Sequence, residues 1–262
     1  MSTLSELLDL EELDNDLFRA NYVFDEKWNL YGGQVAAQAL VAAGRTVDAD
    51  RVPHSLHGYF LRAGSASRPT IFQVTNDRDG GSFSARRVVA LQGGEVIFSA
   101  SLSFHRPALD APDVQEHLIP ETTAPDEART IELTRLFSFE GSRTPQPHKG
   151  RGNPEWPTRF WARCTEPALA KDPVLDAAAL TYVSDYSSAL GLYSRDGWEP
   201  GSSLDHAIWF HHAGVTADWL LSDYQGVRVA HGRGLYTGSV YDTSGRLVAS
   251  IAQEALHRRK RT

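Results

Sequence analysis

Apolar residues recur with helical spacing in the Ala-rich segment 34–47, at Val35, Ala39 and Ala42 or Ala43. This periodicity predicts a thin helix that is apolar nearly all round and must be buried on most sides. Strand-forming residues dominate before and after it, with a Gly-Gly turn ahead of the last strand. The strands predicted in this half of the chain are 17–24, 57–61, 71–75, 82–91 and 95–104.

The same order of elements returns in the second half of the chain. Segment 59–64 has a counterpart 150 residues later at 209–214, and segment 94–99 has one 151 residues later at 245–250. Each copy closes on a His-Arg pair, and the period is far too long for a solenoid repeat. This pattern indicates a duplicated domain. The second copy is predicted to contain a strand at 160–163, a helix at 176–192 and strands at 207–211, 219–229, 233–241 and 246–257.

A helix that is apolar nearly all round can be buried by a strongly curved antiparallel sheet that wraps it. One such unit leaves edge strands open, whereas two units placed edge to edge form one continuous sheet. We therefore predict an α+β double hotdog fold, in which each of two tandem units is a curved antiparallel sheet around a central helix. The expected ranges are 1–106 for the first unit, 107–131 for a linker rich in proline and acidic residues, and 132–262 for the second unit.

Composition supports packed cores and excludes several classes of protein. Hydrophobic residues make up 41% of the 262 residues, which excludes disorder as the main state. The single cysteine, Cys164, excludes a disulfide framework and a Cys-rich zinc site, and it fits a reducing compartment. The acidic N-terminal segment lacks the features of a signal peptide, and nowhere do about 18 apolar residues run together. We expect a cytoplasmic protein without a membrane span.

The net charge of the chain limits the kinds of molecule that it can bind. The formal net charge of -7 argues against general binding of nucleic acid. The one dense basic run lies at residues 257–261, at the end of the chain. Such a run is either a frayed, solvated end or an electrostatic contact for a phosphate-bearing ligand.

Two polar side chains stand out among apolar neighbours. Asp185 lies within the second predicted helix, where nearby serines leave room beside its carboxylate; the alternative is a solvated Asp on an exposed flank. Gln253 shares one face of the last strand with apolar residues, and its counterpart in the first copy is Leu102. A buried carboxamide costs about 1 to 3 kcal/mol unless its hydrogen bonds are met. Gln253 therefore needs a partner, either in a site or in the backbone.

Other polar residues of the second copy allow further interpretations. Ser203, just ahead of the strand at 207–211, is either a turn residue or a functional hydroxyl group. The pairs Asp205-His206 and His211-His212 resemble catalytic or metal-binding sets, but adjacent residues on a strand point to opposite faces. No carboxylate or cysteine spacing completes a metal motif. We expect neither a metal nor a cofactor.

Four collinear motifs resemble the acyl-CoA thioesterase II (TesB-like) family. They are Tyr31-Gly-Gly-Gln-Val-Ala-Ala-Gln-Ala-Leu40, His54-Ser-Leu-His-Gly-Tyr-Phe-Leu-Arg62, Asp79-Gly-Gly-Ser-Phe-Ser-Ala-Arg-Arg87 and Leu204-Asp-His-Ala-Ile-Trp-Phe-His211. The resemblance covers nearly the whole chain except residues 107–129. It implies a double hotdog fold and hydrolysis of acyl-CoA to free acid and CoA, without metal or cofactor. It also implies a homo-oligomer, a dimer or a tetramer.

The resemblance also implies residue roles. In that family an Asp on the second hotdog helix, a Thr ahead of the Asp-His-x-x-Trp-Phe strand and a Gln in the last strand hold the attacking water. These roles fall on Asp185, Ser203 and Gln253, and serine keeps the hydroxyl of the family's threonine.

Three further residues are candidates for binding the substrate. Gly32 and Gly33 would let backbone N–H groups at a helix start approach the oxyanion, or they serve only tight helix packing. His57 is a candidate for the substrate channel, with a histidine satisfied in the core as the alternative.

Two other functional classes remain open at this point. A non-catalytic protein that binds acyl-CoA or acyl chains would keep the hotdog groove without the chemistry, because fold alone does not fix function. A hotdog enoyl-CoA hydratase ranks last, because the Asp and His pair expected together in a hydratase loop is missing.

Overall fold

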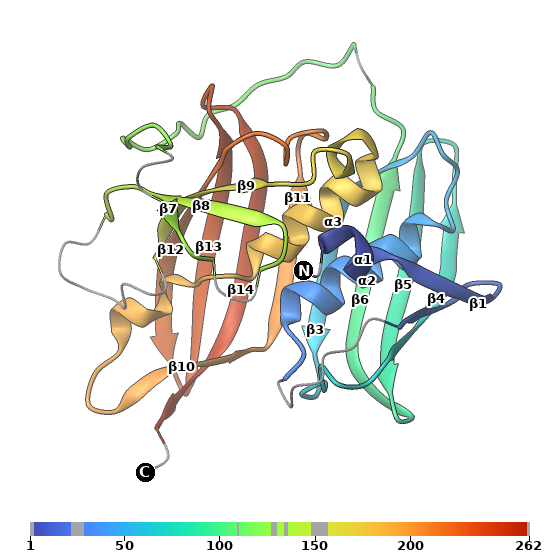
Figure 1. Ribbon diagram of the computed structural model, residues 1–262, viewed down its shortest axis with the longest axis horizontal. Helices are drawn as coiled ribbons and strands as arrows, with labels where there is room; N and C mark the ends of the chain where they lie inside the picture. The colour runs from blue at the N-terminus through green and yellow to red at the C-terminus, as the bar shows by residue number, and fades with distance from the viewer. Residues whose placement is uncertain are drawn as a thin grey trace.

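The computed structural model describes residues 3–21, 29–108, 110–126, 130–133, 136–147 and 157–260. Each half of the chain forms a curved antiparallel sheet that packs against one central helix (Figure 1). The elements of the first half are α1 (Leu4–Leu8), β1 (Leu10–Asp14), β2 (Leu17–Ala20), α2 (Gly32–Gly44), β3 (Val52–Phe60), β4 (Thr70–Asp79), β5 (Phe83–Gln92) and β6 (Glu95–His105).

The second half repeats this plan with additional short strands. Its elements are β7 (Thr130–Ile131), β8 (Phe139–Arg143), β9 (Arg159–Cys164), α3 (Pro173–Ser184), β10 (Trp198–Ser203), β11 (Asp205–Phe210), β12 (Leu220–Ala230), β13 (Arg233–Asp242) and β14 (Leu247–Arg259), with two 3-10 helices, η2 (Leu169–Lys171) and η3 (Ala189–Tyr193). Every strand predicted from the pattern is present. Residues 22–24 of the first predicted strand lie outside the described residues.

The strands of both halves form one sheet, in the order β1-β2-β4-β5-β6-β3-β11-β14-β13-β12-β9-β8-β7, with β10 paired to β14. The halves meet where β3 and β11 pair antiparallel, from Ser55 opposite Trp209 to Tyr59 opposite Asp205. This junction covers an edge that each unit alone would leave open. The prediction of two hotdog units joined edge to edge in one continuous sheet is confirmed.

Helices α2 and α3 lie side by side on one face of this sheet (Figure 1). Their close approach depends on small residues. A Cβ added to Gly33 would lie 2.5 Å from the Tyr182 carbonyl oxygen, and one added to Gly44 would collide with the Val174 side chain. Because almost every residue of α2 is buried, only its Ala-rich sequence lets strands and α3 surround it.

Helix α3 begins and ends at clear signals. Asp172 caps it by accepting the N–H groups of Val174 at 2.8 Å and Leu175 at 3.1 Å, and Pro173 follows at the first helical position. The predicted helix extended to residue 192 and was wrong beyond Ser184, since the chain leaves the helix there. Asp185 is therefore the residue that ends α3, and not a residue in the middle of a helix.

Serine side chains contribute to this early end. The Ser187 hydroxyl donates to the Pro157 carbonyl at 2.6 Å, and Ser188 accepts the Leu190 N–H to start η3. Such local and tertiary hydrogen bonds compete with the helical backbone. The last carbonyl of the helix, that of Ser184, accepts the Tyr224 hydroxyl at 2.8 Å.

The segment between the two units follows the surface of the second half. Gln115 donates to the Gly245 carbonyl at 2.9 Å and accepts the Leu247 N–H at 2.6 Å. Farther along, the Trp161 indole donates to the Thr123 carbonyl at 2.8 Å. Residues 110–126 thus run along the second unit and are hydrogen-bonded to it.

The basic end of the chain is ordered by the sheet. Strand β14 runs to Arg259, and His257 within it is 3% exposed. Residues 257–259 are therefore not frayed, although Arg258 and Arg259 are exposed to solvent, and residues 261–262 lie outside the described residues. Among the residues that the structure describes, no helix combines the length and apolar character that crossing a membrane requires.

Candidate active site

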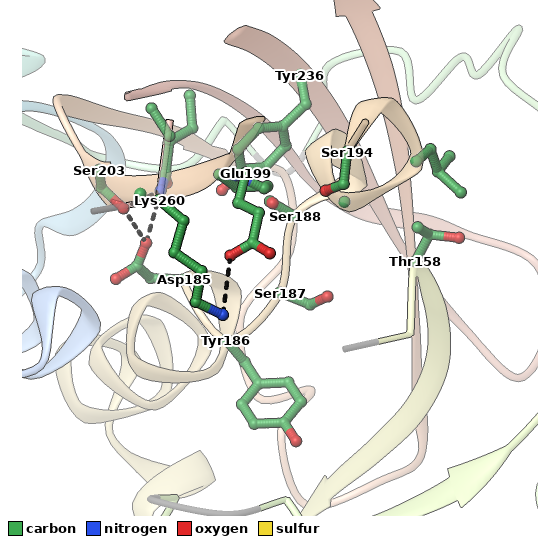
Figure 2. Close-up of a pocket in the computed structure, with 16 residues that line it drawn as sticks. Thr158, Asp185, Tyr186, Ser187, Ser188, Ser194, Glu199, Ser203, Tyr236 and Lys260 are labelled. Atoms are coloured by element: carbon green, nitrogen blue, oxygen red, sulfur yellow. Dashed lines mark hydrogen bonds and ion pairs between the residues drawn. The ribbon is translucent and has the colours of Figure 1, made fainter. Parts of the chain in front are cut away.

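Asp185 at the end of α3, Ser203 on β10 and Gln253 on β14 converge on one point. Figure 2 shows the side chains of Asp185 and Ser203 pointing toward one another. The Ser203 hydroxyl donates to Asp185 Oδ1 at 3.1 Å, and Gln253 Nε2 donates to the same oxygen at 2.6 Å. Gln253 Nε2 also lies 2.7 Å from Ser203 Oγ, which accepts its second hydrogen. The three side chains form a closed triangle of hydrogen bonds in which every donor has a defined acceptor.

The two carboxylate oxygens of Asp185 have different surroundings. Oδ1 accepts both donors of the triangle, whereas Oδ2 faces the first residue of α2 in the other half of the chain. A Cβ added to Gly32 would lie 2.5 Å from Oδ2 and 2.9 Å from the Phe60 ring. Any residue larger than glycine would therefore push the carboxylate aside. The first N–H groups of a helix have no acceptor within the helix, so those of α2 are available next to Oδ2.

His206 fixes the orientation of the Gln253 carboxamide. His206 is fully buried, and its Nδ1 contacts Gln253 Oε1 while its Nε2 lies 2.9 Å from the Ser184 hydroxyl. Because a carboxamide oxygen only accepts, Nδ1 must carry the hydrogen in this contact. The Gln253 nitrogen is then directed at Asp185 and Ser203. The sequence had drawn attention to His206, but its partner is Gln253 on the next strand and not Asp205.

Tyrosines surround the site and stabilise the end of α3. The Tyr31 hydroxyl donates to the Tyr182 carbonyl at 2.7 Å. Burial raises the pKa of Tyr31 and of Tyr236, and the negative charge of Asp185 raises each pKa further. Burial likewise raises the pKa of the Cys164 thiol to about 11. These phenols and this thiol therefore stay protonated at neutral pH.

Two cavities meet at Asp185 and share Tyr186, Gly201 and Ser203 in their walls. The first, about 610 Å³, is called the apolar cavity and is lined by residues that include Leu30, Val35, Phe60, Ile97, Leu136 and Leu256. The second, about 770 Å³, is called the polar cavity and is lined by residues that include Thr158, Ser187, Ser188, Ser194, Glu199 and Lys260. In Figure 2 the Lys260 side chain reaches across the polar cavity towards Glu199, with 3.7 Å between its Nζ and Oε2.

Of the three residues predicted to bind the substrate, one borders a cavity at Asp185 and two do not. Gly32 borders the apolar cavity beside Asp185, whereas Gly33 faces the Tyr182 carbonyl, where its small size serves helix packing. His57 is exposed on the outer face of the sheet, with its ring edge-on to Trp209 at 4.8 Å. It lines neither cavity at Asp185, because its position on β3 directs it away from the helices. The interpretation of His57 as a core residue is therefore wrong, and the residue lies away from both cavities at Asp185.

The remaining histidine pair has separate partners. His211 Nε2 lies 3.0 Å from the Ser250 hydroxyl, and His212 Nε2 lies 3.8 Å from Asp113 Oδ2. Within the described ranges, no group of three or more His, Cys, Asp or Glu residues is arranged to hold a metal ion.

Comparison with known proteins identifies both halves of the chain. The family model for the acyl-CoA thioesterase N-terminal domain matches residues 24–105, and the model for the C-terminal domain matches residues 110–257. Human acyl-coenzyme A thioesterase 8 is 30% identical over 98% of this chain and 89% of its own length. Acyl-CoA thioesterase 2 of Haemophilus influenzae is 29% identical over 98% of both chains.

Solved structures agree with these sequence matches. The acyl-CoA thioesterase II TesB2 from Mycobacterium marinum is 37% identical, with a TM-score of 0.78 over 98% of this chain and 97% of that one. On these matches the chain belongs to the TesB-like acyl-CoA thioesterase II family and is a thioester hydrolase.

Proposed function

We propose that the protein hydrolyses acyl-CoA to a free acid and CoA, with a water molecule activated by Asp185 and positioned with the help of Ser203 and Gln253. The observation that supports this most is the closed triangle of hydrogen bonds on Asp185 Oδ1. It holds one carboxylate oxygen in place at the point where two cavities meet. A base held in this way needs little reorganisation when the reaction starts.

Asp185 Oδ2 is the proton acceptor in this mechanism, because Oδ1 already accepts two hydrogen bonds. Water bound at Oδ2 gives a proton to the carboxylate as its oxygen attacks the thioester carbonyl carbon. The carbonyl oxygen becomes negatively charged and accepts hydrogen bonds from the N–H groups at the start of α2, beside Gly32. When the tetrahedral intermediate collapses, the C–S bond breaks, and the proton held by Asp185 passes to the thiolate of CoA.

The two cavities divide the substrate between them. The apolar cavity suits the acyl chain, because aliphatic and aromatic side chains line it. The polar cavity, with its serines and the Lys260–Glu199 pair, suits the amide-rich arm that carries the thiol of CoA. The thioester carbon then lies beside Asp185, which borders both cavities.

Replacing Asp185 by Asn tests the mechanism. Asn keeps the shape of the side chain and loses the base, so we expect kcat for thiol release to fall by about a hundredfold to ten-thousandfold. Thiol release would be measured with acyl-CoAs of several chain lengths. Asp205→Asn is the matched control, because Asp205 Oδ1 accepts the Glu254 N–H at 2.6 Å and Asn keeps an acceptor there.

Three results would count against the proposal in different ways. Equal rates for wild type and Asp185→Asn would contradict the role of Asp185 while leaving the activity intact. An absence of thiol release from every acyl-CoA would contradict the activity itself. Thermal stabilisation by acyl-CoA without turnover would favour the non-catalytic binding protein instead.

A further inference from the structure

A third cavity, of about 960 Å³, adjoins the polar cavity and shares Leu192 and Ser194 with it. Basic side chains reach it from three segments that are distant in the sequence. Arg195 follows η3, Arg228 lies near the end of β12, His231 belongs to the turn between β12 and β13, and His257 lies near the end of β14. We call it the basic cavity.

The two arginines of the basic cavity have no carboxylate partner within the part of the chain that the structure describes. Among the described residues, neither Arg195 nor Arg228 takes part in an ion pair, and Asp196 is the one acidic residue in the cavity wall. By contrast, Arg233 in the same region lies 2.9 Å from Glu254, and Lys260 of the polar cavity is paired with Glu199. The unneutralised positive charge is thus at the basic cavity, where an anion would be favoured.

His257 and Trp198 add a polar group and an aromatic surface to this charge. His257 is 3% exposed, and among the described residues its buried Nε2 has no hydrogen-bond partner. Its ring stacks parallel to the Trp198 indole, with 6.3 Å between the centroids and 7° between the planes. Trp198 itself is 41% exposed. A buried polar atom without a partner and an open aromatic face are both features that a ligand could satisfy.

We infer that the basic cavity binds the phosphorylated nucleotide end of CoA, with phosphate groups at Arg195 and Arg228 and the adenine on the exposed part of Trp198. This inference rests on the proposed function. The order of the cavities supports it: apolar cavity, Asp185, polar cavity and basic cavity follow the order of acyl chain, thioester, pantetheine arm and nucleotide. The basic C-terminal strand takes part through His257.

The double variant Arg195→Gln/Arg228→Gln tests this placement with two substrates that carry the same acyl group. With acyl-CoA we expect KM to rise by about tenfold or more while kcat stays the same, because contacts made equally to substrate and transition state are lost. With the acyl-pantetheine thioester, which has no nucleotide, we expect neither constant to change. Arg233→Gln is the matched control, since Arg233 is exposed nearby but does not line the cavity.

A direct binding measurement separates this inference from the proposed function. Calorimetric titration with adenosine 3′,5′-bisphosphate should show binding to the wild type and about tenfold weaker binding to the double variant. No binding to the wild type, or an equal rise of KM for both thioesters, would overturn the nucleotide site. If the wild type hydrolyses neither thioester, the proposed function fails, and the titration still decides whether the basic cavity binds a nucleotide.

Discussion

The two halves of the sheet have matching registers but carry different side chains at matching positions. Three positions are apolar in the first half and polar in the second. Pro53 of the first half corresponds to Ser203 of the second, Leu56 corresponds to His206, and Leu102 corresponds to Gln253. In the first half Leu56 lies opposite Leu102 across β3 and β6, whereas His206 and Gln253 are hydrogen-bonded to each other. Polar side chains thus replace an ordinary core contact in one half only.

The ends of the two helices differ in the same way. Helix α3 ends at Asp185, whereas α2 ends at Arg45, whose guanidinium lies 5.9 Å from the Phe18 ring centroid. Helix α2 begins with glycine beside the carboxylate, whereas α3 begins with proline, and Val174 fills the space next to the last turn of α2. Arg45 and Val174 thus stand at the end of the helix pair that corresponds to the end with Asp185 and Gly32.

Because of this asymmetry, the proposed site draws on residues from both halves of the chain. A symmetric pair of hotdog units would offer two equivalent sites, one at each end of the paired helices. Here the second half supplies Asp185, Ser203 and Gln253, and the first half supplies Gly32 at a helix N-terminus. The first half is therefore more than a wall of the site, because its helix start faces the carboxylate.

The largest effect is expected when the polar residues of the second half are replaced by the apolar residues of the first. In the double variant His206→Leu/Gln253→Leu, we expect kcat for thiol release to fall by about a thousandfold, because Asp185 Oδ1 loses a donor. Stability should change by only about 1 kcal/mol, since both partners of a buried hydrogen bond are replaced by apolar groups of similar size. Urea unfolding would measure the stability.

The single variant Gln253→Leu sharpens this prediction. It leaves the buried His206 Nδ1–H without an acceptor, which costs about 1 to 3 kcal/mol. We therefore expect the single variant to be less stable than the double variant, although both are equally inactive. A double variant that is the less stable of the two would show that the His206–Gln253 pair acts as packing and not as a hydrogen bond.

The sequence predicted the fold and part of the site for identifiable reasons. Period-2 and helical patterns indicated the strands and helices. The sequence repeat at an offset of about 150 residues indicated that they are duplicated. Gln253 was found because it interrupts an apolar face. His206 carries the same signal, since it alternates inward with Ile208 and Phe210 and matches Leu56 in the first half. The neighbouring Asp205 hides that signal in the sequence, because the Asp-His pair resembles a catalytic set.

Other features depend on tertiary contacts that no local pattern shows. Strand β10 contains Pro200 and Gly201, which are typical of a turn, and it is a strand because it pairs with the end of β14. The end of α3 at Ser184 is stabilised by the Tyr224 hydroxyl from another strand. The position of Asp185 relative to the helix could therefore not be predicted from helical periodicity alone.

Two substitutions at His206 test how it acts on Gln253, with a smaller expected effect. Asn places its amide nitrogen where Nδ1 of His lies, so His206→Asn keeps a donor to Gln253 Oε1. Gln instead places its nitrogen near Nε2 and keeps only the contact with Ser184. We expect kcat within about threefold of wild type for His206→Asn and a fall of about tenfold to a hundredfold for His206→Gln, with KM unchanged in both.

Thermal unfolding of both His206 variants is the accompanying measurement. If His206 acts only through packing, kcat will fall in proportion to stability and the two variants will rank alike in both measurements. A selective loss of kcat in His206→Gln, at equal stability, is the result that a positioning role requires.

The smallest expected effect concerns a buried charge in the first half whose matching position in the second half is uncharged. Arg86 lies opposite Leu102, at the position where Tyr236 lies opposite Gln253. Arg86 is 2% exposed, and its Nη2 donates to Asp79 Oδ1 at 2.9 Å. Hydrogen bonds from Ser84 and then from Arg86 lower the pKa of Asp79 below its ordinary value. The carboxylate thus stabilises the folded state while it is charged.

Asp79→Asn should lower Tm at neutral pH by about 2 °C, a small change because the Asp79 side chain is 56% exposed. Since the folded-state pKa lies below the unfolded one, the stabilisation is present above the ordinary pKa and is lost as pH falls through the lowered pKa. Thermal scans between about pH 7 and about pH 3 should therefore show the two Tm values converging at the acid end. Thiol release at neutral pH should be unchanged. A gap in Tm that stays constant over this range would mean that Asp79 stabilises the first half by shape, as the apolar residues there do, and not by charge.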